Sequence, residues 1–274
     1  MPSLKNDRLF SRANRRRLGV IKLSELEQYL AELLDVAAFE DYCVNGIQIE
    51  GRSEINSIVT CVSASARLFE IAHKRNVDAV LLHHGLFWRQ SPHPMALTGI
   101  MKKRVKLLLD ADISLLGYHL PLDAHPEFGN NAQISRALGL RDVTFVPVDG
   151  ISNPIAAVGD FPEPMSFAAF VSYVNRVMET EGLGLDFSRS LLRRAFILAG
   201  SGGNYYADAA RAGADVMITG ELREENVRAA EESGLSLYAA GHYNSEKWGI
   251  RALGEHLVEK FDLSVEFLDI PNPV

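Results

Sequence analysis

Two histidines stand at the end of a strongly apolar segment, where they can serve as metal ligands. His83 and His84 directly follow residues 77–82, whose apolar pattern predicts a buried strand. Neighbouring side chains point to opposite faces inside a strand, but the backbone can turn before Gly85 and let both imidazoles converge. Burying two polar rings costs free energy unless each finds a partner. The pair is therefore a candidate for metal ligation, and a hydrogen-bonded core histidine is the alternative.

A second candidate pair lies towards the C-terminus. His242 and Glu246 are four residues apart at the start of a predicted helix. That spacing places both side chains on one helix face, where they can chelate a single cation. A first helical turn with a solvated glutamate is the alternative. Asp123 follows Pro121 and Leu122 in a turn-like segment, where capping of a helix or turn is the alternative role.

Together these residues form a set of three imidazoles and two carboxylates: His83, His84, Asp123, His242 and Glu246. Mixed nitrogen and oxygen donors suit zinc, manganese or iron and are too rich in nitrogen for calcium or magnesium. Five ligands, with one carboxylate able to bridge, can hold two ions at roughly 3.5–4 Å. A hydroxide shared by two such ions is a nucleophile near neutral pH. The set therefore predicts a dinuclear hydrolytic centre.

Two further residues are candidates for catalysis. His119 would crowd Asp123 as a ligand, so we expect it to lie behind the metal ligands or to act as an acid–base group. Glu221 ends a predicted strand and is a candidate base or substrate contact, with an acid in the first turn of a helix as the alternative. Residues 200–203 form a glycine-rich turn whose amides can bind phosphate, but the sequence favours tight-turn geometry as the reason for the glycines.

Strands alternate with helices along the chain, which predicts an α/β fold with mostly parallel strands. Residues 141–165 contain four prolines and are expected to be irregular. An internal duplication is also visible. Residues 76–82 resemble residues 212–218, and residues 113–119 resemble residues 235–242 with one extra residue. Because parallel sheets bind ligands beyond the carboxyl ends of their strands, we expect an active site in the cleft between two similar lobes.

Composition limits the classes of function. The 274 residues are 47% hydrophobic and 23% charged, which is enough chain for one large domain or two small ones. No apolar run reaches the length of about 18 residues that a membrane-spanning helix needs, so we expect no membrane contact. The net charge of −7 argues against a nucleic-acid partner.

The N-terminal segment differs in charge from the remainder of the chain. Residues 1–20 contain six basic residues against Asp7 and no apolar core of a secretory signal. We expect a flexible basic arm, with a targeting or nucleic-acid contact as the alternative. Cys43 and Cys61 form no closely spaced pair, which favours buried thiols and the reducing cytoplasm over disulfides.

Several motifs resemble those of the Nif-three-like family, whose members are named GTP cyclohydrolase 1 type 2 homologs. Residues 77–88 resemble its first metal motif, residues 118–132 its second and residues 239–253 its third. Residues 270–273 resemble its usual C-terminus. The likeness extends from about residue 22 to the end and is strongest to the bacterial YbgI-type subgroup. The basic arm departs from the pattern.

The resemblance implies a dinuclear metal site with His83, His84, Asp123, His242 and Glu246 as ligands. It also implies two interlocked α/β lobes, which we place at residues 21–128 plus 241–274 and at residues 129–240. It implies a ring-shaped homohexamer and opening of the purine ring of GTP, or action on a related small-molecule nucleotide. The alternative is a non-catalytic metal-binding or interaction protein, in which the ions are structural or regulatory.

Overall fold

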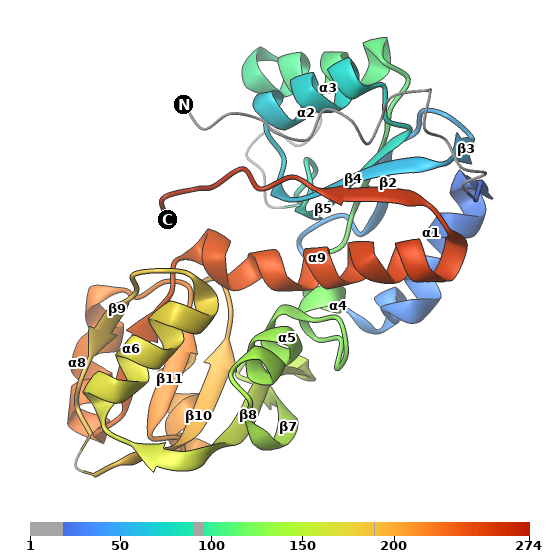
Figure 1. Ribbon diagram of the computed structural model, residues 1–274. Coiled ribbons are helices and arrows are strands. Elements are labelled where there is room, and N and C mark those ends of the chain that lie inside the picture. The colour runs from blue at the N-terminus through green and yellow to red at the C-terminus, as the bar shows by residue number, and fades with distance from the viewer. Residues whose placement is uncertain (1–18, 90–95, 189) are drawn as a thin grey trace.

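The computed structural model describes residues 19–89, 96–188 and 190–274, which form a mixed α/β fold with two large sheets (Figure 1). The long helix α9 (His242–Phe261) runs from one sheet to the other. A small ribbon pairs β1 (Ile21–Lys22) with β3 (Glu54–Ile55). Residues 1–18 of the expected basic arm lie outside the described residues.

The first sheet has five strands, in the order β13 (Ser264–Phe267), β4 (Ser57–Ser63), β5 (Ala79–His84), β6 (Ser114–Gly117) and β2 (Gly46–Ile49). The first four strands pair in parallel, and β2 runs antiparallel to β6. Apolar side chains bury both faces of this sheet. One face packs on α2 (Ala66–Arg75) and α3 (Gly99–Asp110), and the other on α1 (Leu23–Leu33) and α9.

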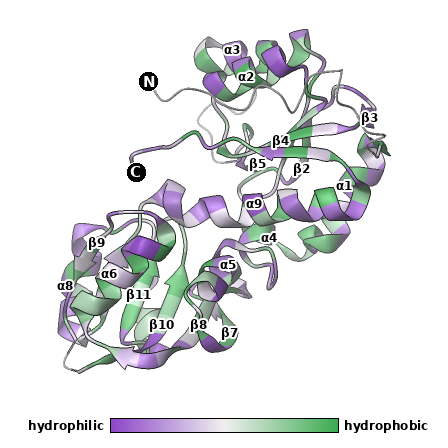
Figure 2. Ribbon diagram, viewed as in Figure 1, coloured by the Kyte–Doolittle hydropathy of each residue, from purple (hydrophilic) through white to green (hydrophobic). Residues whose placement is uncertain are grey.

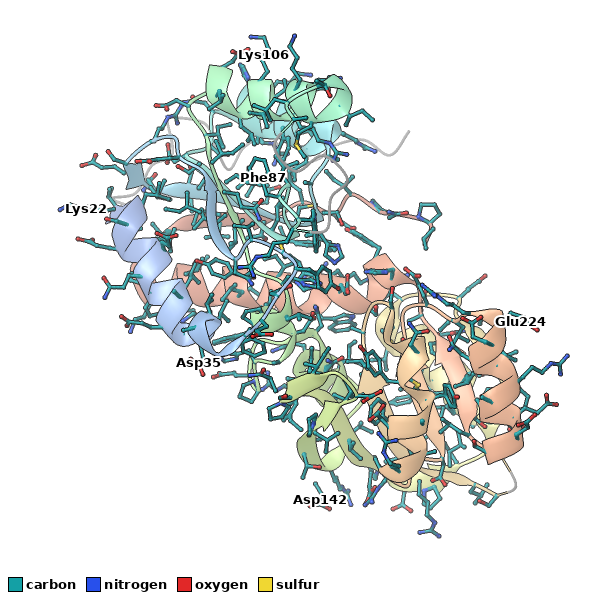
Figure 3. All side chains as sticks on the ribbon, turned by 180° about the vertical axis from the view of Figure 1, so that it is seen from behind. Lys22, Asp35, Phe87, Lys106, Asp142 and Glu224 are labelled. Atoms are coloured by element: carbon teal, nitrogen blue, oxygen red, sulfur yellow. The ribbon has the colours of Figure 1, made fainter. Side chains whose placement is uncertain are left out.

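The second sheet has six strands, in the order β7 (Arg141–Val148), β8 (Ile151–Met165), β10 (Leu192–Leu198), β11 (Val216–Thr219), β12 (Ser236–Ala239) and β9 (Leu183–Leu185). Its faces are covered by α5 (Asn130–Ala137) and α6 (Phe167–Met178) on one side and by α7 (Tyr206–Arg211) and α8 (Glu224–Ser233) on the other. Figure 2 shows the central strands mainly in green. Polar side chains such as Lys106 and Glu224 project outward from the helices (Figure 3).

The expectation of mostly parallel strands holds for the first sheet and is wrong for the second. There the pairings β7–β8, β8–β10 and β12–β9 are antiparallel. The segment expected to be irregular forms the long hairpin β7–β8, which closes at Asp149 and Gly150 between the paired residues Val148 and Ile151. Gly150 has φ +75°, a conformation that favours glycine in such turns. The pairing shifts register next to Pro147, which has no amide hydrogen to donate.

The duplicated sequence corresponds to a shared arrangement of strands. Both sheets contain three consecutive parallel strands connected through helices, β4–β5–β6 in one and β10–β11–β12 in the other. Helix α9 contacts the cores of both sheets, with Trp248 against the second and Ile250, Leu253 and Leu257 in the first. The lobe boundaries after residues 128 and 240 stay a prediction.

Candidate metal centre

Parallel strands from both sheets end at one cavity. His83 and His84 end β5, and His119 follows β6. Glu221 follows β11, and His242 follows β12 and begins α9. The cavity has a volume of about 620 Å³ and is lined by residues from the loops of both sheets. Its position agrees with the rule that parallel sheets bind ligands beyond the carboxyl ends of their strands.

The carboxylate of Glu246 lies among three imidazoles. Its Oε2 is 3.1 Å from Nε2 of His84 and 2.9 Å from Nε2 of His242. Its Oε1 is 3.7 Å from Nε2 of His83, which lies 3.6 Å from Oδ2 of Asp123. The structure therefore brings together all five residues expected to bind metal, from β5, from the short helix α4 (Leu120–Asp123) and from α9.

Within the described part of the chain, ligand atoms form two overlapping groups. One consists of His83, His84 and His119, and the other of His84, His242 and Glu246. Inside each group all ligand atoms lie within 4.8 Å of one another. We expected His119 behind the ligands, whereas this geometry makes it a ligand candidate as well. Asp123 belongs to neither group and reaches the cluster through its contact with His83.

Hydrogen bonding leaves one nitrogen of His83 available to a cation. Nδ1 donates to the carbonyl oxygen of Tyr118 at 3.1 Å, so the neutral imidazole carries its lone pair on Nε2. This Nε2 atom is buried without a hydrogen-bond partner, and the buried Oε2 of Glu246 makes no hydrogen bond of regular geometry although two imidazole nitrogens lie 2.9 and 3.1 Å from it. Buried polar atoms normally have a partner. An orphaned nitrogen and oxygen among imidazoles and carboxylates fit divalent transition-metal ions.

The same contacts shift the pKa values of the cluster. Burial disfavours a charged imidazole, yet the carboxylates around His83 and His242 outweigh it and raise the pKa of each to about 9. Burial lowers the pKa of His84 despite the nearby Glu246. Burial would raise the pKa of Glu246, but the imidazoles around it hold that pKa well below its usual value. The metal-free cluster therefore binds protons where a cation would bind.

Outer hydrogen bonds orient two of the candidate ligands. Asn130 is fully buried and donates from Nδ2 to Oδ1 of Asp123 at 2.8 Å, while its Oδ1 accepts from the amide of Gly249 on α9. Glu221 binds Nδ1 of His242 through Oε1, which leaves Nε2 of His242 directed at the cluster. Such carboxylate and amide partners set ring orientation and tautomer in metal sites.

Asp41 is a site residue that no sequence pattern indicated. It is 6% exposed, and its Oδ1 lies 3.0 Å from Nδ1 of His119. The amides of Cys43 and Leu120 also donate to this carboxylate. Burial would raise the pKa of Asp41, but its hydrogen bond and attraction to His119, together with its bonds to Asn45 and to the amide of Cys43, outweigh burial and lower that pKa to about 2. The carboxylate is therefore ionised and holds His119 with Nε2 free.

The glycine-rich turn has a packing role. Gly200 has φ +63°, and a Cβ added there would lie 2.2 Å from Oε1 of Glu246. The glycine thus makes room for the central carboxylate of the cluster. The helix α7 that follows the turn begins only after the 3₁₀ segment Gly202–Tyr205. The steric requirement at Gly200 accounts for glycine there without a bound phosphate.

The sequence profile of the Duf34/NIF3 (NGG1p interacting factor 3) family matches residues 21–273. The chain belongs to the Duf34/NIF3 family. A relative from Pasteurella multocida (strain Pm70), named GTP cyclohydrolase 1 type 2 homolog, is 42% identical over 250 residues, which are 91% of this chain and 98% of the relative. This membership confirms the resemblance drawn from the motifs.

Solved structures of the family share this fold. The structure of protein ybgI, described as of unknown function, superimposes with a TM-score of 0.86 at 41% identity and covers 93% of this chain and 100% of its own. TTHA1606 from Thermus thermophilus gives a TM-score of 0.82 at 32% identity, with coverage of 93% and 100%. Among the described helices, none is both long and apolar enough to cross a membrane.

Proposed function

We propose that the chain is a metal-dependent hydrolase with a dinuclear centre held by His83, His84, Asp123, His242 and Glu246. The observation that carries the proposal is the Glu246 carboxylate, whose two oxygens lie 2.9 to 3.7 Å from three imidazole nitrogens. A carboxylate with both oxygens placed in this way can bridge two ions. The donor set suits two divalent ions of zinc, iron or manganese.

The proposed substrate is a small molecule of the nucleotide type. A relative at 42% identity is named GTP cyclohydrolase 1 type 2 homolog, so opening of the purine ring of GTP is the first reaction to test. The cavity of about 620 Å³ has the size of sites that bind such ligands. Because a fold and a site do not determine a substrate, related nucleotides belong to the same proposal.

The residues around the ions have separate tasks. Two divalent ions held by these residues would lower the pKa of a water molecule and stabilise negative charge on the attacked group. His119 lines the cavity with Nδ1 bound to Asp41, so its Nε2 can accept or donate a proton. Glu221 also lines the cavity, and its side chain is 38% exposed, which makes it the second candidate for proton transfer. Asn130 keeps one oxygen of Asp123 directed at His83.

The second candidate function is a non-catalytic one in which the ions join the two sheets. The donors come from β5 of the first sheet and from α9, which packs on both sheets. Glu221, which follows β11 of the second sheet, supports His242 from behind. Ions bound to this set would stabilise the folded chain, and chelation would lower its melting temperature.

One assay separates the two functions. Zinc-, iron- and manganese-loaded protein is incubated with GTP and related nucleotides, and release of formate is measured. His83→Ala and Glu246→Gln should abolish turnover, whereas His73→Ala, at an exposed histidine on α2, should retain it. Turnover no higher than that of His83→Ala would contradict the hydrolase. A melting temperature that collapses on chelation, without turnover of any nucleotide, would favour the structural role.

We also propose that the chain forms a homohexamer, as the family resemblance implies, and that it acts in the reducing cytoplasm, which its two unpaired cysteines favour. Light scattering coupled to size-exclusion chromatography measures the mass of the assembly directly. A mass of six chains of 30.3 kDa supports the hexamer, and a monomer or dimer contradicts it.

A further inference from the structure

The cavity beside the candidate metal centre has an aromatic wall, formed by the rings of Tyr42, Trp88, His84 and His119. The centroids of Tyr42 and Trp88 are 5.6 Å apart. The His119 ring lies 5.0 Å from that of Tyr42 and 5.3 Å from that of Trp88, and His84 lies 5.8 Å from Trp88. All four residues line the cavity. The proposed chemistry gives Tyr42 and Trp88 no task.

The backbone holds this wall in place. Cys43 and Trp88 form an antiparallel bridge, and the amide of Arg89 donates to the carbonyl oxygen of Tyr42 at 2.7 Å. The indole Nε1 of Trp88 donates to the carbonyl oxygen of Gly85 at 3.0 Å. Gln48 adds a second link, because its Oε1 accepts from the amide of Leu86 at 2.6 Å, and its Nε2 donates to the carbonyl oxygen of Val44. The wall is therefore preorganised.

The wall is also open to a ligand. Tyr42 is 43% exposed, and Trp88 is half-buried. Phe87, which precedes Trp88 and is labelled in Figure 3, packs instead against the core beside the first sheet. The rings of Tyr42 and Trp88 therefore offer faces on which a planar ring can stack, whereas the ring of Phe87 is used in core packing.

The charges of the cavity disfavour a phosphate chain as the group that the protein recognises. Three carboxylates line it, those of Asp123, Glu221 and Glu246. No lysine or arginine occurs among the lining residues, all of which belong to the described part of the chain. Loops and strands of the second sheet contribute apolar side chains to the lining, such as those of Ile155 and Leu198, and the amide of Asn204. A phosphate would have to be neutralised by bound cations alone.

We propose that the aromatic wall binds a planar heterocyclic ring of the substrate by stacking on Tyr42 and Trp88, and that the protein recognises this ring and not a phosphate chain. The inference deepens the proposed function and rests on it only in taking this cavity as the substrate site. Stacking of a base on an aromatic side chain is tolerant of the base, so purines and other flat heterocycles belong to one class here. The ring would then lie beside His84, a proposed metal ligand, and beside His119, the proposed proton-transfer group.

The chain contains two tryptophans, which makes the test direct. Trp248 packs against the core of the second sheet, and Trp248→Phe leaves Trp88 as the sole tryptophan reporter. The full-length variant is loaded with zinc and titrated with guanosine, ribose 5-phosphate and inorganic tripolyphosphate. The titrations are repeated after chelation. Near-ultraviolet circular dichroism checks that each variant keeps its fold.

We expect guanosine to quench Trp88 emission with and without zinc. Tyr42→Leu should weaken guanosine binding by about 5- to 150-fold, and Tyr42→Phe should leave it within about 3-fold, because stacking needs the ring and not the hydroxyl. Trp88→Leu, followed by equilibrium dialysis, should show a loss like that of Tyr42→Leu. Tripolyphosphate and ribose 5-phosphate should not bind the chelated protein.

Three results would overturn the inference. These are guanosine binding that is absent, guanosine binding that is equal in wild type and Tyr42→Leu, and tripolyphosphate binding to the chelated protein as tightly as guanosine. The proposed function fails separately. If guanosine binds as described and no nucleotide is hydrolysed, the hydrolase is contradicted while the ring-binding wall stands.

Discussion

Replacing Glu246 by Gln should destabilise the metal-free protein, and the loss should depend on pH. Glu246 is 4% exposed, and its Oε2 lies 2.9 Å from Nε2 of His242. An amide keeps the shape but removes the charge that favours protonated His83 and His242, whose pKa values are raised from 6.5 to about 9. Because these folded-state values exceed the unfolded one, the stabilisation is complete below pH 6.5 and is lost as the pH rises through 9.

The size of the effect follows from burial. Removing one member of a buried ion pair costs about 3–5 kcal/mol, since the remaining charge is left without a partner. At about pH 6 we therefore expect Glu246→Gln to lose about 3 kcal/mol, which corresponds to a fall in melting temperature of about 6–12 °C. At about pH 9.5 the two histidines are mostly neutral in the wild type, so the loss should shrink to about 1 kcal/mol or less.

Urea unfolding in the presence of a chelator, followed by circular dichroism at both pH values, measures this difference. Glu255→Gln is the matched control, because Glu255 is an exposed glutamate on the same helix. It should change the free energy of unfolding by less than about 0.5 kcal/mol. A loss for Glu246→Gln that is equal at both pH values, or below about 1 kcal/mol at the lower pH, would refute the reasoning.

Three further predictions rest on the same geometry. Zinc binding at pH 7 should release about two protons, because His83 and His242 have pKa values of about 9 and must be neutral to bind a metal ion. Calorimetry in buffers of different ionisation enthalpy measures this number, and binding without proton release would contradict the prediction. Gly200→Ala should lower zinc occupancy, because its Cβ would lie 2.2 Å from the Glu246 carboxylate. Gly213→Ala is the control, because Gly213 also has a positive φ (+70°) but an added Cβ would have no atom within 4 Å; this variant should keep its zinc occupancy. Equal zinc occupancy in the two variants would count against the packing argument. Asp41→Asn should reduce turnover roughly 10- to 100-fold with unchanged metal content, and full activity would exclude the orienting role.

The candidate ligands could be predicted because their positions depend on local sequence spacing and on the order of strands in the sheets. His83 and His84 end an apolar strand, and His242 and Glu246 share one helix face. Parallel pairing then brings strand ends to one edge, as the registers of β5 with β6 and of β11 with β12 show. The internal duplication of the sequence indicates in addition that the chain forms two such sheet edges. These inferences require knowledge of strand pairing but of no other contact between residues that are distant in the sequence.

The other features of the site depend on contacts between distant residues, which produce no periodic pattern in the sequence. Asp41 and His119 are 78 residues apart, and no spacing rule connects them. Tyr42 and Trp88 are brought together by the Cys43–Trp88 bridge and a few hydrogen bonds between segments that are distant in the sequence. The sequence pattern does not predict the hairpin β7–β8, because prolines interrupt the alternation of apolar and polar residues; Asp149–Gly150 is a turn signal in this segment.

The five proposed ligands should bind one pair of cations at the cavity on which strand ends of both sheets converge. Inductively coupled plasma mass spectrometry of zinc-loaded protein, after removal of loosely bound metal, tests this claim most directly. We predict about two zinc ions per chain in the wild type and a large loss in Glu246→Gln, whose oxygens contact the imidazoles of both groups. One ion or none in the wild type, or two ions still bound to Glu246→Gln, would contradict the dinuclear centre.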